Sequence, residues 1–466
     1  MLFLFGCLIK SIPLPSPQVD VSPVVDRINW QDVSAEATAI LQGYIQTDTT
    51  NPPGNESRGA EFLAQILEKE GIESTIIESS PGRGNLIARI SGNDQEKPLC
   101  LLSHIDTVTY EADQWKHHPL SGKKDAGYIW GRGALDMKNM GVMELMSMLL
   151  IHRQKIQLNR DIILIAVADE EDGGEGMQHL VNHHWDKLQC GQLINEGGLG
   201  LKDAIFSGQN IYPISVGEKG SLWLKMRARG PSGHGSTPRP GEASEKLLHA
   251  IEKLQKHKIQ TRINPTLAQF LSNVGQQKGG ITSFVMRQPM LRDALVKPKL
   301  EANPLTKAAM MNTIHITGFG GHHRPNVVAS EVFVQLDCRL LPGVEPREFL
   351  ETLKSIVGAD VDFIVLHEQA GNASPINDPL FFALSRYANQ NESNAATGPV
   401  ISVGFTDSIY VRPKGTRAYG FVPVLLTAED MEGFHGVDER ISQENLLRGT
   451  QKLFSAILEV SMLSPQ

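Results

Sequence analysis

The feature that most constrains the fold of this chain is a set of short apolar runs that end directly in acidic or histidine side chains. Continuous apolar runs of this kind are typical of strands buried on both faces of a parallel sheet. In open α/β sheets, sites are built where the carboxyl ends of such strands meet. The pattern therefore predicts a site at one edge of a sheet. The runs are residues 99–103 before His104-Ile105-Asp106, residues 161–167 before Ala168-Asp169-Glu170-Glu171, and residues 192–194 before Asn195-Glu196.

Helical patterns alternate with these strands. Residues 57–70 have amphipathic spacing, and residues 141–153 form a strong helix candidate. The chain has 466 residues, of which 41% are apolar and 21% charged, which fits a soluble globular protein of two or three domains. We therefore expect an α/β fold whose main domain has a mostly parallel sheet flanked by helices.

The pattern changes near residue 214, which indicates a second domain inserted into the first. The segments SLWLKMRARG and EVFVQLDCRLL alternate apolar with polar residues, as half-exposed antiparallel strands do. We expect residues 214–368 to form an α+β lid or dimerisation domain with an antiparallel sheet. Residues 25–213 and 369–466 would then form the main domain, and residues 1–24 an N-terminal extension.

The first nine residues, MLFLFGCLI, are apolar but too few to span a bilayer. They also lack the basic residues that begin a signal peptide. The segment before Cys7 nevertheless resembles the end of a bacterial lipoprotein signal, in which the cysteine is lipidated. A lipidated start and a ragged start both stay open, and so does the choice between a cytoplasmic and an exported protein. Membrane contact is expected only if Cys7 is lipidated.

Charge and cysteine content exclude two further classes. The net charge is −8, with 44 Lys and Arg against 52 Asp and Glu, and this balance argues against nucleic acid as a partner. The four cysteines form no CxxC pair, so a disulfide framework is not expected. Cys100 and Cys338 lie in apolar stretches and are predicted to be small buried hydrophobes.

Acidic side chains at the ends of apolar strands are costly unless they bind something. Two histidines and three carboxylates can be collected from separate motifs, and this ligand set suits a pair of zinc ions better than magnesium or calcium, which prefer oxygen alone. Co²⁺ and Mn²⁺ are expected substitutes. The predicted ligands are His104, Asp136, Glu171, Glu196 and His435.

A series of motifs spanning nearly the whole chain resembles the M20 metallopeptidase family, which includes aminoacylase, carboxypeptidase G, succinyl-diaminopimelate desuccinylase and yeast carboxypeptidase S. The resemblance is strongest to the carboxypeptidase S-like branch. Each motif alone is weak, but their combination and order are specific. They are SHIDTV (103–108), GRGALDMK (131–138), ADEEDGGEG (168–176), NEGG (195–198), GPSGHGSTP (230–238), DCRLLPG (337–343), GFTDS (404–408) and HGVDER (435–440).

The resemblance implies a role for each ligand. Asp136 would bridge both metals and would be followed by a cis peptide bond. His104 and Glu196 would complete one metal site, and Glu171 and His435 the other.

The resemblance also implies catalytic and substrate-binding residues. Asp106 would accept a hydrogen bond from His104, and Glu170 would be the general base. His234, in the inserted domain, would reach an active site, often that of a partner subunit, and stabilise the oxyanion. Asn326 would line the substrate pocket. Ile409 stands where several relatives have an arginine near the substrate carboxylate, which leaves Arg412 as the candidate for that contact.

Taken together, these residues predict hydrolysis of an amide bond next to a free carboxylate, as in a carboxypeptidase, a dipeptidase or an N-acyl-amino-acid deacylase. The substrate would be a small peptide or an N-acyl amino acid, and the lid could form a homodimer. Two alternatives stay open. One is an N-acyl-amino-acid synthase that uses the same chemistry in reverse, and the other is a non-catalytic binding protein on the same fold.

Overall fold

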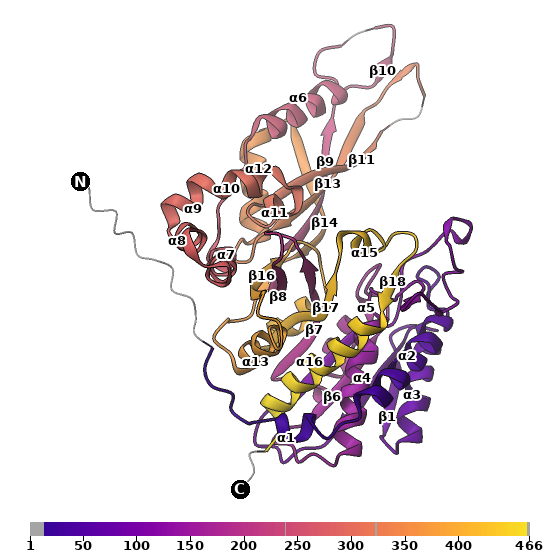
Figure 1. Ribbon diagram of the computed structural model, residues 1–466. Coiled ribbons are helices and arrows are strands. Elements are labelled where there is room, and N and C mark those ends of the chain that lie inside the picture. Colours follow the sequence, from indigo (N-terminus) through magenta and orange to yellow (C-terminus); the bar gives the residue numbers. More distant parts are fainter. Residues whose placement is uncertain (1–13, 238, 322–323, 464–466) are drawn as a thin grey trace, which may run out of the picture.

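The apolar runs identified in the sequence form the middle of a large sheet. The computed structural model describes residues 14–237, 239–321 and 324–463, and in these residues the sheet has nine strands (Figure 1). The four central strands run parallel, whereas antiparallel pairs lie towards both margins, so the predicted fold class is confirmed. In spatial order the strands are β1 (Ser74–Glu78), β2 (Gly84–Ile90), β6 (Ile162–Val167), β3 (Leu99–His104), β7 (Gln192–Lys202), β17 (Arg417–Leu426), β8 (Asn210–Glu218) and β15 (Asn372–Ala373), with β16 (Ala395–Ser402) also paired to β8.

Helices cover both faces of this sheet. Leu99 and Leu101 of β3 face one apolar core, and Cys100 and Leu102 face another. Every residue of β3 and β6 is consequently buried, as continuous apolar strands require. The first core contains α2 (Trp30–Gln46), α3 (Glu56–Lys69), α4 (Lys138–Arg153), α13 (Pro379–Ala388) and α16 (Gln443–Ser461), and the second contains α5 (Glu175–His183) and α14 (Ser408–Val411).

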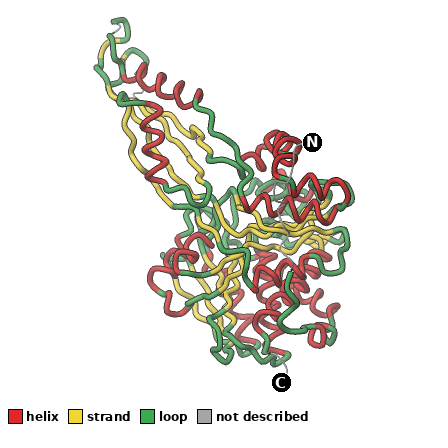
Figure 2. The backbone as a smooth tube through the Cα atoms, turned by 90° about the vertical axis from the view of Figure 1, so that its left-hand side faces the viewer, coloured by secondary structure: helices red, strands yellow, loops and turns green. Residues whose placement is uncertain are grey.

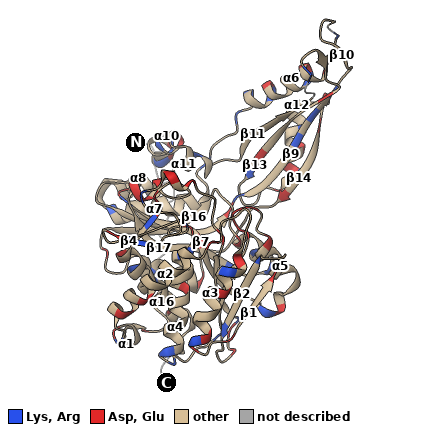
Figure 3. Ribbon diagram, turned by 90° about the vertical axis from the view of Figure 1, so that its right-hand side faces the viewer, with Lys and Arg blue, Asp and Glu red and all other residues tan. Residues whose placement is uncertain are grey.

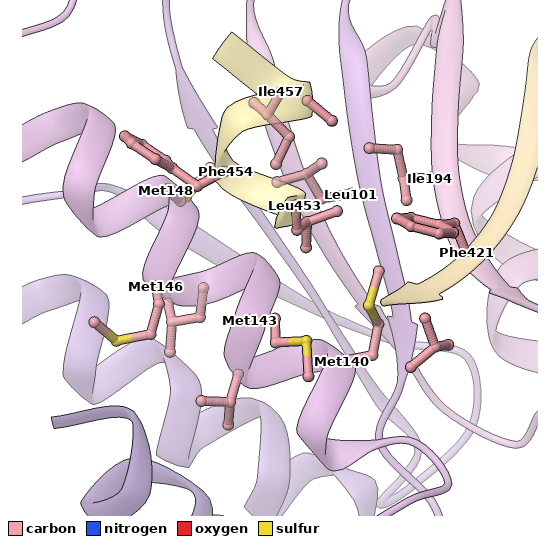
Figure 4. Close-up of a cluster of buried hydrophobic side chains, with 14 of the residues drawn as sticks. Leu101, Met140, Met143, Met146, Met148, Ile194, Phe421, Leu453, Phe454 and Ile457 are labelled. Carbon is pink, nitrogen blue, oxygen red and sulfur yellow. The ribbon is translucent and has the colours of Figure 1, made fainter. Parts of the chain in front are cut away.

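Helix α4 connects the main core to the site. It is buried from Lys138 to Ile151, because the sheet, α2 and α16 all pack against it, as a helix that is apolar on all sides requires. Figure 4 shows Met140 and Met143 of α4 in the same apolar cluster as Leu101 and Leu453. The helix begins directly after Asp136, and the peptide bond between Asp136 and Met137 is cis, as expected.

The inserted domain contains a separate antiparallel sheet. Alternate residues of its strand β9, from Leu222 to Ala228, are buried against two helices, which explains the alternation seen in the sequence. Figures 1 and 2 show this lid projecting from the main domain. In spatial order its strands are β11 (Thr313–Gly320), β13 (Glu331–Leu340), β9 (Gly220–Arg229) and β14 (Val361–Gln369), and its helices are α6 (Ala243–Lys256) and α12 (Pro346–Val357).

The chain leaves the large sheet after Glu218 and enters the lid sheet at Gly220. Residues 265–308 fall within the range predicted for the lid, but their first helix packs against β16 of the large sheet, where Phe270 and Val274 meet Ala396. These residues form α7 (Pro265–Lys278), α8 (Gly280–Arg287), α9 (Pro289–Leu295), α10 (Lys297–Ala302) and α11 (Pro304–Ala308).

Smaller elements complete the described chain. Two form a short antiparallel two-stranded sheet at the end of the lid remote from the main domain (Figure 1), namely β10 (Gly233–His234) and β12 (Val327–Val328). The others are α1 (Ser22–Val25), α15 (Ala428–Glu432), the three-stranded sheet of β18 (Arg440–Ser442), β5 (Tyr128–Trp130) and β4 (Lys123–Asp125), and the 3-10 helices Ala112–Gln114, Trp185–Lys187 and Arg412–Lys414.

The apolar start of the chain, including Cys7, lies outside the described residues. Among the helices that are described, none combines the length and the apolarity that crossing a bilayer requires. The prediction about Cys7 therefore stays a prediction.

Cys100 and Cys190 form a disulfide bond, so the prediction that Cys100 is an unpaired hydrophobe is wrong. Cys100 lies on β3 and Cys190 lies just before β7, and these two strands are neighbours in the sheet. Their Cα atoms are 5.7 Å apart despite a separation of 90 residues. Spacing in the sequence cannot reveal a pairing that depends on strand order. Cys338 is free and buried, as predicted.

We expect the double variant Cys100→Ala/Cys190→Ala to lose about 2–5 kcal/mol of the free energy of unfolding, because the unfolded chain is no longer cross-linked. Urea unfolding with and without reductant measures this. The wild type and the Cys338→Ala control should both be weakened by reductant, and the double variant should not respond. Equal stability of wild type with and without reductant would contradict the assignment.

Candidate metal centre and active site

The five side chains predicted as metal ligands meet at the carboxyl ends of the central parallel strands. They come from five separate places in the chain, which the sheet and α4 bring together. His104 ends β3, Asp136 precedes α4, Glu171 follows β6, Glu196 lies on β7, and His435 follows α15.

Strand β7 does not end at Glu196, as the sequence suggested, but continues to Lys202. Strand β17 pairs with β7 on both sides of Glu196, with register irregularities between Asn195 and Leu199 and between Leu199 and Gly200. At Gly420 of β17 the two backbones come so close that a Cβ atom would lie 2.1 Å from the Glu196 carbonyl oxygen. Glycine is therefore required at position 420. Glu196 accordingly faces the site from a strand and not from a loop.

The Asp136 carboxylate lies between the two histidines. Its Oδ1 atom is 3.0 Å from His104 Nε2, and its Oδ2 atom is 2.8 Å from His435 Nε2. Glu171 Oε2 lies 3.3 Å from His435 Nε2, and Glu196 Oε1 lies 3.9 Å from His104 Nε2. Each oxygen of Asp136 thus belongs to a different histidine and glutamate pair, which is the arrangement expected of a bridging ligand.

The charges of this cluster fit a bound cation. Burial, followed by repulsion from neighbouring carboxylates, raises the pKa of Glu170 and of Glu196 well above the usual range. Glu171 Oε1 is buried and accepts no hydrogen bond from the described residues. Carboxylates in such surroundings become protonated unless a cation replaces the proton. The nitrogen and oxygen donors of the five residues therefore fit divalent metal ions of the zinc type.

His104 is oriented by a backbone group and not by the predicted carboxylate. Its Nδ1 atom lies 3.0 Å from the backbone oxygen of Asp106 but 3.6 Å from the nearest carboxylate oxygen of that residue. The chain turns back after β3, which brings the carbonyl closer than the side chain. Donation from Nδ1–H to this carbonyl leaves the Nε2 lone pair facing Asp136, as a metal ligand requires.

The Asp106 carboxylate instead holds the turn that carries two functional glutamates. It is completely buried and accepts hydrogen bonds of 3.1 Å from the backbone N–H groups of both Glu170 and Glu171. Asn51 also donates to it, at 2.9 Å. Asp106 therefore fixes the position of a predicted base and a predicted ligand at once.

A second layer of charges holds the same turn from behind. Arg83 contacts Glu56 at 2.6 Å and Asp169 at 3.0 Å, while Asn51 donates to Asp169 at 2.9 Å. Asp169 has a φ of 67°, a left-handed conformation that is costly for a residue with a side chain and persists where its surroundings impose it. The cluster of Glu56, Asp106 and Asp169 could resemble a metal site, but Arg83 and Asn51 already supply its partners.

Glu439, the fifth residue of the HGVDER motif, is a positioning residue. Its carboxylate accepts from the backbone N–H of Leu135 at 2.6 Å and of Asp136 at 3.1 Å, and from Arg132 at 2.6 Å. Arg132 in turn donates to the Gly436 carbonyl at 2.9 Å. The buried pair of Arg132 and Glu439 thus ties the backbone at Asp136 to the loop that carries His435.

A pocket of about 400 Å³ is lined by four of the five predicted ligands, Asp136, Glu171, Glu196 and His435. Glu170 also lines it, and no described residue of the lining is a lysine or an arginine. The remaining surface is largely apolar and is formed by Leu135, Met137, Leu199, Leu305, Phe405, Val422 and Phe434. The site therefore combines a charged metal-binding end with an apolar chamber.

Two predicted residues of the lid are not at this site. His234 and Asn326 are exposed and lie beside each other at the two-stranded sheet at the far end of the lid, where Gly235 N–H donates to the Asn326 carbonyl at 2.9 Å (Figure 1). The only polar contacts of the His234 ring within the described residues are with Ser236. A role for these residues in the active site of another subunit stays a prediction.

Arg412 is also directed away from the pocket. Its guanidinium is 3% exposed and contacts Glu218 at 3.0 Å. It donates further to Asn372 at 3.1 Å and to the Ala418 carbonyl at 3.1 Å. The side chain thus joins strands β8, β15 and β17 and does not present a free cation to a substrate. The sequence could not show this partner.

The fold and the chemistry of the site define a metal-dependent amidohydrolase. The chain belongs to the peptidase family M20/M25/M40, whose family model matches residues 100–459. It is 32% identical over 425 residues to the human N-fatty-acyl-amino acid synthase/hydrolase PM20D1, with 86% of this chain and 83% of that protein covered. It is 27% identical to pig aminoacylase-1, with 92% and 96% covered.

Solved structures have the same fold. The M20 family metallo-carboxypeptidase Sso-CP2 from Sulfolobus solfataricus superposes with a TM-score of 0.69 at 19% identity, over 91% of this chain and 99% of that one. Human carnosine dipeptidase 1 superposes with a TM-score of 0.62 at 15% identity, over 96% and 99%. At these identities the likeness establishes the architecture, including the lid.

We expect Glu439→Gln to weaken metal binding by about 10–100-fold. In the wild type the carboxylate accepts hydrogen bonds from backbone N–H groups. The glutamine amide would turn its own N–H donor towards some of these groups and lose those hydrogen bonds. Competition with a zinc indicator measures the affinity. Asp438→Asn is a matched control, since Asp438 contacts only Lys116 N–H among the polar contacts seen in the described residues. Unchanged affinity in Glu439→Gln would show that the loop holds its shape without the carboxylate.

Proposed function

We propose that this protein uses two zinc ions to hydrolyse the amide bond of N-acyl amino acids that carry an apolar acyl group. The observation that carries the proposal is the pocket, in which Glu170 and four of the predicted metal ligands lie beside apolar lining residues. Cleavage next to a free carboxylate was the expectation from the sequence, and an acyl chain would fill the chamber better than a polar peptide.

His104 and Glu196 would hold one ion, Glu171 and His435 the other, and Asp136 both. Bound there, the ions would lower the pKa of water and polarise the scissile carbonyl. The carbonyl-directed orientation of His104 and the Glu439 contacts would keep the ligands in place as substrates enter and leave.

Glu170 would act as the general base. Its carboxylate can approach both His104 and Glu196 within 4.8 Å, and it is not needed to complete either ligand set. The raised pKa caused by burial favours a group that takes a proton from water and then gives it to the leaving nitrogen. A closed structural metal site would have no use for such a residue.

The comparisons support an acyl substrate in two ways. The human relative at 32% identity is named for N-fatty-acyl amino acids, and the pig relative is named an aminoacylase. Synthesis of the amide would run through the same residues in reverse, with the direction set by substrate supply. A non-catalytic binding role is the weaker alternative, because the five predicted ligands and the predicted base lie together.

A series of N-acyl amino acids with acyl chains of increasing length, together with dipeptides, tests the substrate class. Each buried methylene contributes roughly 0.8 kcal/mol, so kcat/KM should rise about fourfold per methylene until the chain outgrows the chamber. Similar kcat/KM values for acetyl and long-chain substrates, or a preference for dipeptides, would argue against an acyl chamber.

We predict that Glu170→Gln lowers kcat by about 10²–10⁴-fold while leaving the zinc content unchanged, because it removes proton transfer and not a ligand. The neighbouring Glu171→Gln is the matched control and should lose metal as well as turnover. Parallel kinetics and elemental analysis distinguish the two. Loss of metal from Glu170→Gln to the same degree would assign it as a ligand instead of the base.

His234→Ala is predicted to lower kcat by about 10²–10³-fold if this histidine donates to an oxyanion. Because His234 lies remote from the pocket of its own chain, the donor would have to come from a second subunit. Mixing His234→Ala with Glu170→Gln should then restore part of the activity, since a mixed dimer has one complete site. Full activity of His234→Ala alone would remove the residue from the mechanism.

A further inference from the structure

The helices α8 to α11 expose an unusual concentration of apolar side chains. Six of the sixteen large apolar residues that are exposed in the described chain fall between residues 281 and 305. Single exposed apolar residues are ordinary, but a contiguous group marks an interaction surface. We call this group the apolar rim, and it consists of Ile281, Phe284, Met290, Leu291, Leu295 and Leu305, whose exposed fractions range from 36% to 80%.

The orientation of these helices is fixed by packing on α7. Met286 of α8 is buried and lies so close to Gly275 that a Cβ atom on that glycine would be 2.6 Å from the Met286 Cβ. In the same region Gln288 and Arg292 are buried, at 8% and 4% exposure. This region therefore buries two polar side chains while the apolar rim residues stay exposed, which is unlike the pattern of an ordinary surface helix.

The segment is also basic, in contrast to the whole chain. Residues 278–307 contain six lysines and arginines but two acidic residues, whereas the chain as a whole carries a net charge of −8. Lys278, Lys299 and Lys307 are exposed. Figure 3 shows α8, α10 and α11 grouped at one edge of the main domain beside the lid. Apolar side chains among lysines match a surface that is negatively charged outside and apolar beneath.

We propose that α8 to α11 form a docking surface for an anionic phospholipid bilayer. Apolar rim residues would enter the acyl boundary and the lysines would contact the phosphate groups. A second copy of the chain fits less well, because two such basic faces would repel each other in a symmetric dimer.

The rim also reaches the pocket. Leu305 is 63% exposed and at the same time lines the chamber that contains Glu170 and His435. A bilayer docked here would lie next to the entrance for an apolar acyl chain. This last link rests on the proposed function, but the docking itself does not.

Flotation of the full-length protein with vesicles tests the docking without any turnover. The wild type should float with phosphatidylcholine vesicles that contain 30 mol% phosphatidylserine, and high salt should weaken the binding. The double variant Ile281→Glu/Phe284→Glu should lower the bound fraction at least tenfold. Phe319→Glu, on lid strand β11, is the matched control because Phe319 is similarly exposed at 74%, and it should bind as the wild type does.

Hydrolysis of a soluble N-acetyl amino acid by the double variant should stay at the wild-type level. This control shows that the variant is folded. It also separates a failure of docking from a failure of the proposed function. Three results would overturn the proposal. The first is a wild type that does not float. The second is a double variant that still floats, because another segment such as residues 1–9 would then hold the protein on the vesicle. The third is a light-scattering measurement that finds a dimer in the wild type and a monomer in the double variant, because the surface would then be a dimer interface.

Discussion

Mutual repulsion among buried carboxylates is the constraint around which the main domain is built. Glu170, Glu171, Glu196 and Asp136 converge at one edge of the sheet, together with two histidines. Burial and repulsion from neighbouring carboxylates raise the pKa of Glu170 and of Glu196, so without a cation these two groups tend to take up protons. Divalent cations offset this cost, and the energy of metal binding then becomes part of the energy of folding. Strands β3, β6 and β7 are rigid and apolar because they must hold these groups together.

Precision at the site comes from residues that would never touch the metal. Asp106 holds the turn of Glu170 and Glu171, Arg83 and Asn51 hold Asp169 behind it, and Glu439 holds the backbone at Asp136. Asp106 and Glu439 accept hydrogen bonds from backbone N–H groups, whereas Arg83 and Asn51 contact side-chain carboxylates. Such contacts fix geometry more firmly than ligands on loops could do alone. The pocket beside them supplies room for a substrate.

Local sequence patterns were sufficient for the strands and for three of the five predicted metal ligands. A continuous apolar run that ends in an acidic residue or a histidine predicts a buried strand and also the edge of the sheet at which that strand ends. His104, Glu171 and Glu196 could therefore be placed at this edge without knowledge of any other residue. The assignment of Asp136 and His435 as ligands needed the family resemblance, because neither residue directly follows a continuous apolar run in the sequence.

What the sequence could not predict depends on which segments become neighbours. The Cys100–Cys190 disulfide follows from the adjacency of β3 and β7, and the burial of Arg412 follows from Glu218 on a strand far away in the chain. The role of Glu439 required knowing that its loop lies against the backbone of Asp136. Whether the carbonyl or the carboxylate of Asp106 meets His104 is decided by a turn of two residues, which composition does not encode.

The most direct test of this account is the number of zinc ions that the metal-free protein binds in a calorimetric titration. Two ions per chain, falling to at most one in Asp136→Ala, would confirm that a single aspartate bridges a two-metal centre. One ion or none in the wild type, or two ions in Asp136→Ala, would contradict it.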